Sequence, residues 1–464
     1  MLFWIFALGQ TERSVFGRVP ILDEVYYLDR AAELAGAETP LAEPYFMSPL
    51  YPRLVAAAGA GGGVPEDRVF AGAELRGLRL LQIFCWLGTL ILIRLLAARL
   101  VPDDWTGRAR AAALWLPVIL FALYRPAAVY ALAVLLETPL LFLVIFSVYL
   151  MSARGSKPAW VLLLGVSLGL AGLLRGTTLL LVPVAMAFLW RGVNFRSALS
   201  LGVLVVGVAL ALAPAVVHNS RLVGHPVGPT LNGGVNLYIG NGPEANGFYV
   251  AAVPGDWRHD PAGRQFLAER FDLPQVSLAQ ADSIWAESAR HHMRRDPGRV
   301  LGLMARKIWL QLQTWEIDQL TPLAGWTAQV PTLRLLVTPY ALMVVLGLAG
   351  LVGNRKAWWL AAALVLLLLG QSLFFVVSRY RLVLIPMWSV LAGVGAIHLY
   401  RRQRLALVVA ALALLVTVPW GLNDVRTSWA ALAQANEALR WADVGQAEDS
   451  RPALEKAELL YRQS

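Results

Sequence analysis

Long apolar runs constrain this chain more than any other feature of its sequence. A helix that crosses a membrane needs about 20 residues, because each residue adds about 1.5 Å. The mean hydropathy is +0.58 and only 15% of the residues are charged, against about 25% in a soluble domain. Ten apolar runs are candidate spans, and they cover residues 78–98, 111–124, 127–151, 159–174, 177–190, 197–217, 335–353, 357–377, 380–399 and 405–420.

The apolar residues 1–10 add a partial span, because ten residues give only about 15 Å of helix. Either residues 11–22 extend this helix or the true start lies upstream, and we expect the second. The fold class predicted is therefore an all-α integral membrane protein with about 11 transmembrane helices, the first one truncated. Two large extracytoplasmic loops with in-plane amphipathic helices complete this prediction.

The distribution of charge predicts the orientation of the chain. Counted from a cytoplasmic N-terminus, the short cytoplasmic loops and span ends hold 13 of the 40 basic residues but only two of the 30 acidic ones. Cytoplasmic loops are typically rich in Lys and Arg, so this pattern explains the net charge of +10 without a nucleic-acid partner. The only cysteine is Cys85, which excludes a disulfide framework within the chain.

Three polar segments are expected outside: residues 11–77, 218–334 and 421–464. The first two are loops of a transmembrane domain that covers residues 1–420, and we expect in-plane helices at 23–35, 50–60 and 299–315 because their apolar residues follow a helical period. Residues 277–295 predict a further helix. The last segment, 421–464, has the pattern of a helical hairpin that resembles one tetratricopeptide unit.

Adjacent carboxylates, Asp23 and Glu24, open the first outer loop. They suit catalysis at the membrane surface, but they also suit the N-terminus of a helix, where acids are stabilising, and both interpretations can hold. Glu137 lies inside the run 127–151, so it should face a polar cavity or the bundle interior. Pro139 follows closely, and proline is tolerated in a first turn, so the span itself is expected to begin near Glu137.

The order of several short motifs resembles the GT-C superfamily of polytopic glycosyltransferases, in the branch of protein O-mannosyltransferases and the lipid A aminoarabinose transferase. The likeness covers about residues 1–420. The motifs are Asp23-Glu24-x-x-Tyr27, Ser48-Pro49-Leu50-Tyr51-Pro52, the Gly/Asn-rich run from Asn232 to Asn241, and Ser378-Arg379-Tyr380-Arg381-Leu382 with Pro386.

The resemblance implies a sugar donor carried on a polyprenyl phosphate and transfer on the outer face of the membrane to a lipid, glycan or protein acceptor. Carried over to this sequence, Asp23 is the acceptor-side base and Glu24 its partner. Arg379 and Arg381, which a tyrosine separates, are favoured for the lipid phosphate, although they would also suit snorkelling anchors. The remaining expected substrate contacts are Tyr27, Glu137, Lys307, Tyr380, Asn232 and Asn236, although the Asn232–Asn241 run is also typical of plain turn structure.

No cofactor is firmly implied by the resemblance. The aminoarabinose transferase has a Glu-Lys-Pro element whose glutamate is linked to a metal, whereas this chain has Met47-Ser48-Pro49 there. A divalent-metal site of that kind is therefore not expected. Arg125 and Arg175 are interpreted as interfacial anchors.

Two other classes of function compete with a glycosyltransferase. A transporter or lipid flippase would also be polytopic, but it usually shows internal repeats, and none is clear here. A catalytically inactive scaffold that presents the C-terminal helices is the other alternative. The location expected in each case is a bacterial cytoplasmic (inner) membrane, with the site and the C-terminal tail extracytoplasmic.

Overall fold

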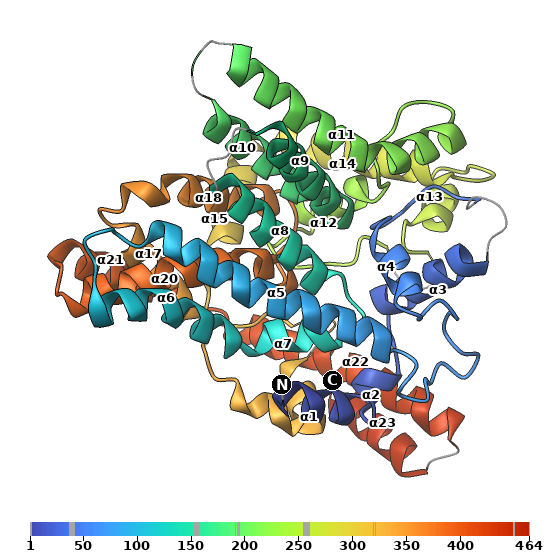
Figure 1. Cartoon of the computed structure of the whole chain (residues 1–464). Helices are drawn as coiled ribbons and strands as arrows, with labels where there is room; N and C mark the ends of the chain where they lie inside the picture. The colour runs from blue at the N-terminus through green and yellow to red at the C-terminus, as the bar shows by residue number, and fades with distance from the viewer. Residues whose placement is uncertain are drawn as a thin grey trace.

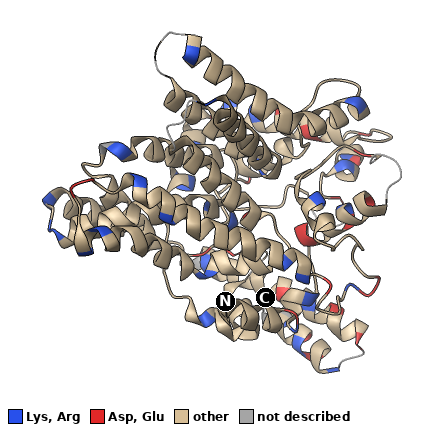
Figure 2. Ribbon diagram, in the orientation of Figure 1, with Lys and Arg blue, Asp and Glu red and all other residues tan. Residues whose placement is uncertain are grey.

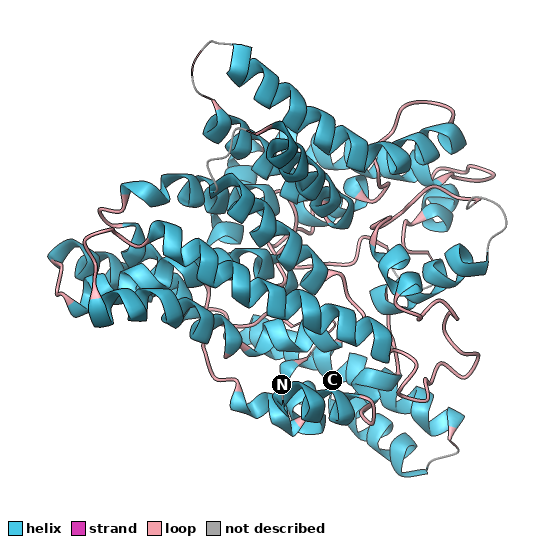
Figure 3. Cartoon of the chain, viewed as in Figure 1, coloured by secondary structure: helices cyan, strands magenta, loops and turns pink. Residues whose placement is uncertain are grey.

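A computed structural model describes residues 2–36, 42–152, 157–190, 192, 195–253, 260–318, 320, 322–448 and 451–463. Within these ranges every regular element is a helix, and no strand occurs (Figure 3). The all-α class predicted from the apolar periodicity is confirmed.

Several helices have the length and composition needed to cross a membrane, so the chain is an integral membrane protein. Among the described residues, four qualify, or five if a pair bent by 52° at residues 123–124 counts as one span. Six shorter apolar helices accompany them, and the predicted total of 11 spans stays a prediction. The four are α5 (Arg76–Leu100), α11 (Phe195–Val223), Pro331–Leu351, which includes η2 (Pro331–Leu335) and α17 (Tyr340–Leu351), and Ser378–Tyr400, which includes α19 (Ser378–Arg381), η4 (Leu382–Leu384) and α20 (Ile385–Tyr400).

The shorter apolar helices show where the predicted boundaries were wrong. Residues 127–151 were expected as one apolar run, but α7 ends at Leu132 and a separate helix begins at Glu137, the alternative boundary expected from Pro139. The run 177–190 likewise begins as a 3-10 helix. The bent pair consists of α6 (Gly107–Ala122) and α7 (Arg125–Leu132). The shorter apolar helices, with the 3-10 turns that precede two of them, are α1 (Leu2–Thr11), α8 (Glu137–Ser152), α9 (Pro158–Leu174), η1 (Gly176–Leu180) with α10 (Leu181–Leu189), η3 (Arg355–Ala357) with α18 (Trp358–Ser372), and α21 (Arg404–Thr417).

The segments between the apolar helices also fold into helices, several of them at the expected positions. They are α2 (Val15–Arg18), α3 (Asp23–Gly36), α4 (Tyr51–Ala57), α12 (Gly233–Asn241), α13 (Arg264–Arg270), α14 (Leu278–Arg295), α15 (Pro297–Leu312) and α16 (Leu323–Gln329). Ser277 caps α14 by accepting a hydrogen bond from the Gln280 amide, and Asp296 caps α15 in the same way through Arg299.

The Gly/Asn-rich run was expected to form turns, and this expectation was wrong because most of it is the helix α12. Tight packing explains Gly234, because a Cβ there would lie 1.9 Å from the Asp282 carbonyl oxygen of α14. The Gly234 amide also donates a hydrogen bond of 2.6 Å to the Asp282 side chain. Glycine here permits two helices to approach, rather than a turn.

The chain ends in two helices, α22 (Asn423–Ala447) and α23 (Arg451–Gln463), which pack against each other as a hairpin. Figure 1 places this hairpin beside α1 and α2, so the two ends of the chain lie close together. An ion pair of 2.6 Å between Arg18 and Glu448 joins the two regions.

Charged residues are unevenly distributed over the molecule (Figure 2). Asp and Glu gather around α3, α13 and the C-terminal helices, whereas the opposite end, where α17 and α21 lie, carries mainly Lys and Arg. This is the separation that the positive-inside pattern predicts, and the orientation itself stays a prediction.

Candidate functional site

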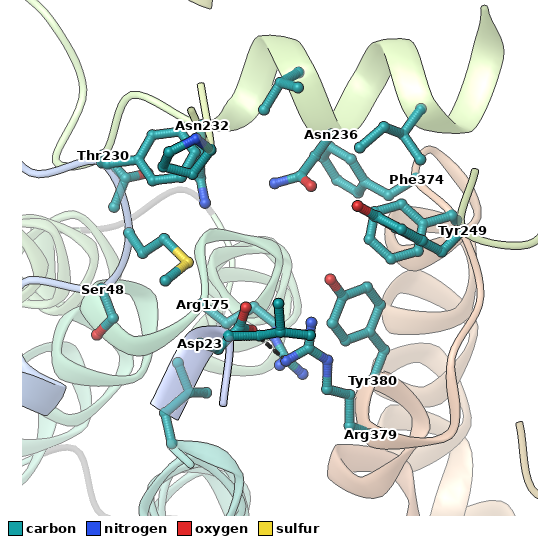
Figure 4. A pocket seen from close by; sticks show the side chains of 18 of the residues that line it. Asp23, Ser48, Arg175, Thr230, Asn232, Asn236, Tyr249, Phe374, Arg379 and Tyr380 are labelled. Atoms are coloured by element: carbon teal, nitrogen blue, oxygen red, sulfur yellow. Dashed lines mark hydrogen bonds and ion pairs between the residues drawn. The ribbon is translucent and has the colours of Figure 1, made fainter. Parts of the chain in front are cut away.

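A cavity of about 550 Å³ lies among helices of the polar segments, such as α3, α12 and α22, and the ends of several apolar helices. Its polar lining comes from segments far apart in the sequence: the first turn of α3, the first turn of α8, the residues that follow α9, the region of α12, and α19 (Figure 4). Seven of the predicted site residues line it, namely Asp23, Tyr27, Glu137, Asn232, Asn236, Arg379 and Tyr380.

Two ion pairs lie in the wall of this cavity. Asp23 Oδ2 lies 2.5 Å from Arg379 Nη1, and Glu137 Oε1 lies 2.8 Å from Arg175 Nη2. Both guanidinium groups also lie against the ring of Tyr380, at 4.4 Å for Arg175 and 5.3 Å for Arg379. The two pairs therefore place two carboxylates beside two guanidiniums, as Figure 4 shows for Asp23, Arg175 and Arg379, and Asp260 is a further carboxylate of the described lining.

Several charged atoms at these pairs keep unused hydrogen-bonding capacity. Among the described residues, Glu137 Oε2, Arg175 Nη1 and Arg379 Nε are buried and have no hydrogen-bond partner. Because buried polar groups are nearly always hydrogen-bonded, such atoms beside a cavity favour a polar ligand. Guanidinium N–H groups pair best with carboxylate or phosphate oxygens.

Tyrosines form part of the wall near Asp23. Burial raises the pKa of Tyr27 well above its usual range, and the nearby Asp23 and Glu137 carboxylates add to this effect. Burial likewise raises the pKa of Tyr249 to about 12. Both phenols are therefore neutral near pH 7 and offer O–H donors to a ligand.

The Ser48–Pro52 motif fixes one wall of the cavity. The Ser48 hydroxyl donates a 2.9 Å hydrogen bond to the Leu173 carbonyl oxygen and accepts one of 3.2 Å from the Tyr51 amide. The Tyr51 ring packs against Tyr27 with 4.8 Å between ring centroids. The motif thus ties the first polar segment, residues 11–77, to the end of α9, two residues before Arg175.

Three predicted residues are not among the described residues that line the cavity: Glu24, Arg381 and Lys307. The buried Arg381 guanidinium donates to the carbonyl oxygens of Gln313 and Trp315 and pairs with Glu316. These contacts join α19 to the segment that follows α15, so they support the fold.

Lys307 and Glu24 also make internal contacts. Lys307 Nζ lies 3.3 Å from Asn241 Oδ1, and burial, with a smaller effect from Arg299, lowers the pKa of Lys307 to about 8. Glu24 Oε2 pairs with Arg440 of α22 at 2.8 Å.

The sequence analysis missed Arg175, which it interpreted as an interfacial anchor. Arg175 lines the cavity and pairs with Glu137. A signal was present in the sequence: Arg175 stands between two apolar runs and is followed by Gly176-Thr177-Thr178, where the helix breaks. The contributions of Tyr249, Leu432 and Asn436 to the lining had no recognisable motif.

The expectation that this chain has no divalent-metal site of the aminoarabinose-transferase kind stays a prediction. Across the part of the chain that the structure describes, no three His, Cys, Asp or Glu side chains lie together as a metal site. Of the carboxylates that line the cavity, Asp23 and Glu137 are each paired with an arginine, and Asp260 accepts hydrogen bonds from backbone amides of α13. Met47 and Ser48 also line the cavity.

Comparison with known proteins links part of this chain to a family. Residues 58–221 match the family model of dolichyl-phosphate-mannose-protein mannosyltransferases. The resemblance to polytopic glycosyltransferases is confirmed. The match supports a glycosyltransferase, and it includes Glu137 and Arg175 but not α3 or α19. No curated protein matches the chain significantly.

Similar solved structures include two of ArnT from Cupriavidus metallidurans. The one bound to undecaprenyl phosphate is 16% identical, with a TM-score of 0.44, and the apo one is 15% identical, with a TM-score of 0.41. Each match covers 100% of this chain and 74% of that chain. The archaeal oligosaccharyltransferase AglB from Archaeoglobus fulgidus, in complex with an inhibitory peptide and a dolichol-phosphate, is 13% identical, with a TM-score of 0.45, and the match covers 100% of this chain and 59% of AglB.

Proposed function

We propose that this protein transfers a hexosyl or pentosyl group from a polyprenyl-phosphate-linked donor to an acceptor hydroxyl. The reaction takes place at the outer face of a bacterial cytoplasmic membrane. One observation carries the proposal: the Asp23–Arg379 and Glu137–Arg175 pairs share a single cavity in a chain with a glycosyltransferase family segment.

Sugar transfer from such a donor needs two kinds of group close together. The acceptor oxygen attacks the anomeric carbon while the bond from that carbon to the phosphate oxygen breaks, and the electron pair leaves with the phosphate. A carboxylate near the acceptor oxygen takes up the hydroxyl proton, and cationic donors stabilise the departing phosphate. The cavity supplies both kinds of group.

Asp23 is the proposed base. It begins α3, and its ion pair with Arg379 fixes the orientation of the carboxylate in the cavity. Arg379 and Arg175 are proposed to bind the phosphate, since planar guanidiniums pair well with phosphate oxygens and both retain an unpartnered buried nitrogen among the described residues. Glu137 orients Arg175.

The other polar lining residues are proposed to hold the sugar. Asn232 and Asn236 at α12 face Tyr249 and Tyr380 across the cavity (Figure 4), and amides and phenols are suitable partners for sugar hydroxyls. The aromatic faces add apolar contact area for a sugar ring.

Reconstituted transfer tests the proposal. Purified full-length protein in lipid vesicles is supplied with undecaprenyl phosphate that carries a labelled hexose or pentose, and with membranes from a strain that lacks the gene as the source of acceptor. We expect label to move to the acceptor with the wild type and with Asp103→Asn, a control whose carboxylate is exposed and contacts Lys356. Mass spectrometry of envelope glycans with and without the gene identifies the acceptor.

Two results would count against the proposal. If Asp23→Asn transfers at the wild-type rate, Asp23 is not the base. If the wild type transfers none of the sugars offered and the envelope glycans do not depend on the gene, the proposed activity itself is wrong.

A further inference from the structure

Arg440 of the C-terminal hairpin reaches the start of the first outer helix. Its guanidinium is 1% exposed and pairs with Glu24, whose side chain is 2% exposed, at 2.8 Å. It also donates hydrogen bonds to the carbonyl oxygens of Val19 and Leu320 and lies over the ring of Phe16 at 5.2 Å. One side chain of α22 therefore contacts four separate groups, which belong to residues 16–24 and to Leu320.

Glu24 in turn joins three segments of the chain. Besides Arg440, its carboxylate accepts a hydrogen bond of 3.1 Å from the Ile21 amide and one of 3.3 Å from the Val134 amide. Ile21 lies two residues before Asp23, and Val134 lies three residues before Glu137. The carboxylate of Glu24 thus fixes the backbone close to Asp23 and the backbone close to Glu137.

The backbone just before Asp23 is strained. Leu22 has a φ of +50°, in the left-handed region that costs a side-chain-bearing residue free energy and persists only where the surroundings hold it. Two contacts hold the backbone that leads into it: Arg440 donates to the Val19 carbonyl oxygen, and the Ile21 amide donates to the Glu24 carboxylate. Loss of Arg440 would allow this turn to relax and would move Asp23.

Helix α22, which carries Arg440, also forms part of the cavity wall. Leu432 and Asn436 of α22 line the cavity together with Leu320, whose carbonyl oxygen is near Arg440. Trp429, one turn earlier, packs against Phe248 with ring centroids 6.0 Å apart. The hairpin is therefore attached to the cavity along more than two turns of α22.

We propose that α22 is part of the active site, with Arg440 as a positioning residue that sets the placement of Asp23 relative to Glu137. The inference rests on the proposed sugar transfer, and it assigns residues 421–464 to the catalytic unit instead of a separable tail. Arg440 acts through Glu24, so it affects the rate of the chemical step more than the binding of the lipid donor.

Arg440→Met tests this inference in the full-length protein, with Arg462→Met as the matched control. Arg462 belongs to the same hairpin and pairs with Glu458, but its side chain is 75% exposed. Two quantities are measured on monodisperse protein: the kcat and donor KM of sugar transfer, and hydrogen exchange of the peptides that cover residues 19–28 and 132–140.

For Arg440→Met we expect kcat to fall about 10- to 100-fold with KM within about twofold, and exchange to rise in both peptides. The double variant Glu24→Gln/Arg440→Met should recover part of kcat, because it leaves no unpaired buried carboxylate. A purely structural role would lower the yield of folded protein and leave kcat per folded molecule unchanged. Arg462→Met should behave as wild type.

Unchanged kcat and unchanged exchange in Arg440→Met would overturn the inference. If that variant does not fold, Arg440→Lys replaces it, and wild-type kcat and exchange in the lysine variant would overturn it equally. If the wild type transfers no sugar, the exchange of the two peptides still decides whether Arg440 holds them, and only the proposed function fails.

Discussion

Arg379 and Arg381 are separated by one residue, yet the structure gives them different tasks. Arg379 faces the cavity and pairs with Asp23, whereas Arg381 is buried among Gln313, Trp315 and Glu316. Methionine at either position removes the charge and keeps most of the side-chain length. The two substitutions should therefore separate loss of function from loss of stability.

The magnitudes follow from the contacts. Arg381→Met removes contacts of 2.7 Å, 2.8 Å and 2.6 Å to Gln313, Trp315 and Glu316, and it leaves Glu316 without this partner. Removing one partner of a buried ion pair costs about 3–5 kcal/mol of unfolding free energy. Arg379→Met removes one ion pair whose members are 11% and 14% exposed at the edge of a cavity, so about 1–2 kcal/mol is expected.

The effects on catalysis should run in the opposite order. Removing a donor that stabilises developing negative charge typically lowers kcat about 100- to 1000-fold, and this is the loss expected for Arg379→Met. For Arg381→Met, transfer per folded molecule should stay within about threefold of the wild type, because its contacts lie outside the cavity lining.

Thermal unfolding in detergent, followed by tryptophan fluorescence, gives the melting temperature of each variant. Transfer is then measured on the monodisperse fraction from size-exclusion chromatography. We expect the larger drop in melting temperature for Arg381→Met and the larger drop in transfer for Arg379→Met. A stable Arg381→Met that has lost transfer would refute the reasoning, since Arg381 would then contact the substrate.

Three further predictions follow from the site and its surroundings. Asp23→Asn should abolish transfer and lower the melting temperature only modestly, by about as much as Arg379→Met, because it weakens the same ion pair; fluorescence-detected unfolding checks this. Arg175→Met should raise the donor KM about tenfold or more, because it removes a proposed phosphate contact and leaves Glu137 without this partner. If a donor titration gives an unchanged KM, Arg175 is an interfacial anchor. Burial, with help from Glu316, raises the pKa of Asp318 to about 8 from 3.8, against the opposing effects of the Leu323 amide and Arg381. The folded state then keeps a proton that the unfolded chain releases above about pH 4, so this group makes the protein less stable as the pH rises from about 4 to 8. Asp318→Asn should therefore have a higher melting temperature than the wild type at pH 8 but not at pH 4. If the difference in melting temperature is the same at both pH values, the raised pKa of Asp318 is wrong.

The sequence also predicted much of the cavity without any structure. Asp23, Tyr27, Arg379 and Tyr380 were selected from two short motifs more than 350 residues apart, and the structure brings them together. The buried position of Glu137 followed from the cost of a carboxylate in an apolar run. The roles of these residues stay predictions, but their gathering at one cavity was open to sequence reasoning, because charge in an apolar setting carries information of its own.

Three predicted residues are absent from the described cavity lining for a common physical reason. Arg381 was chosen from the same motif as Arg379, but α19 is a helical turn that directs side chains two residues apart to different sides. Lys307 and Glu24 found partners in segments distant in sequence, Asn241 and Arg440. Local pattern does not specify such partners.

By itself, the sequence determined that this chain is an all-helical integral membrane protein, because the long apolar runs leave few other ways to satisfy the backbone. It also determined which acidic and basic residues were candidates for the site. Only the tertiary structure decided that Arg175 pairs with Glu137, that Arg381 supports the fold, and that α22 reaches the cavity. These facts depend on how segments distant in the sequence pack together, which hydrophobic periodicity does not specify because it fixes only which face of each helix is buried.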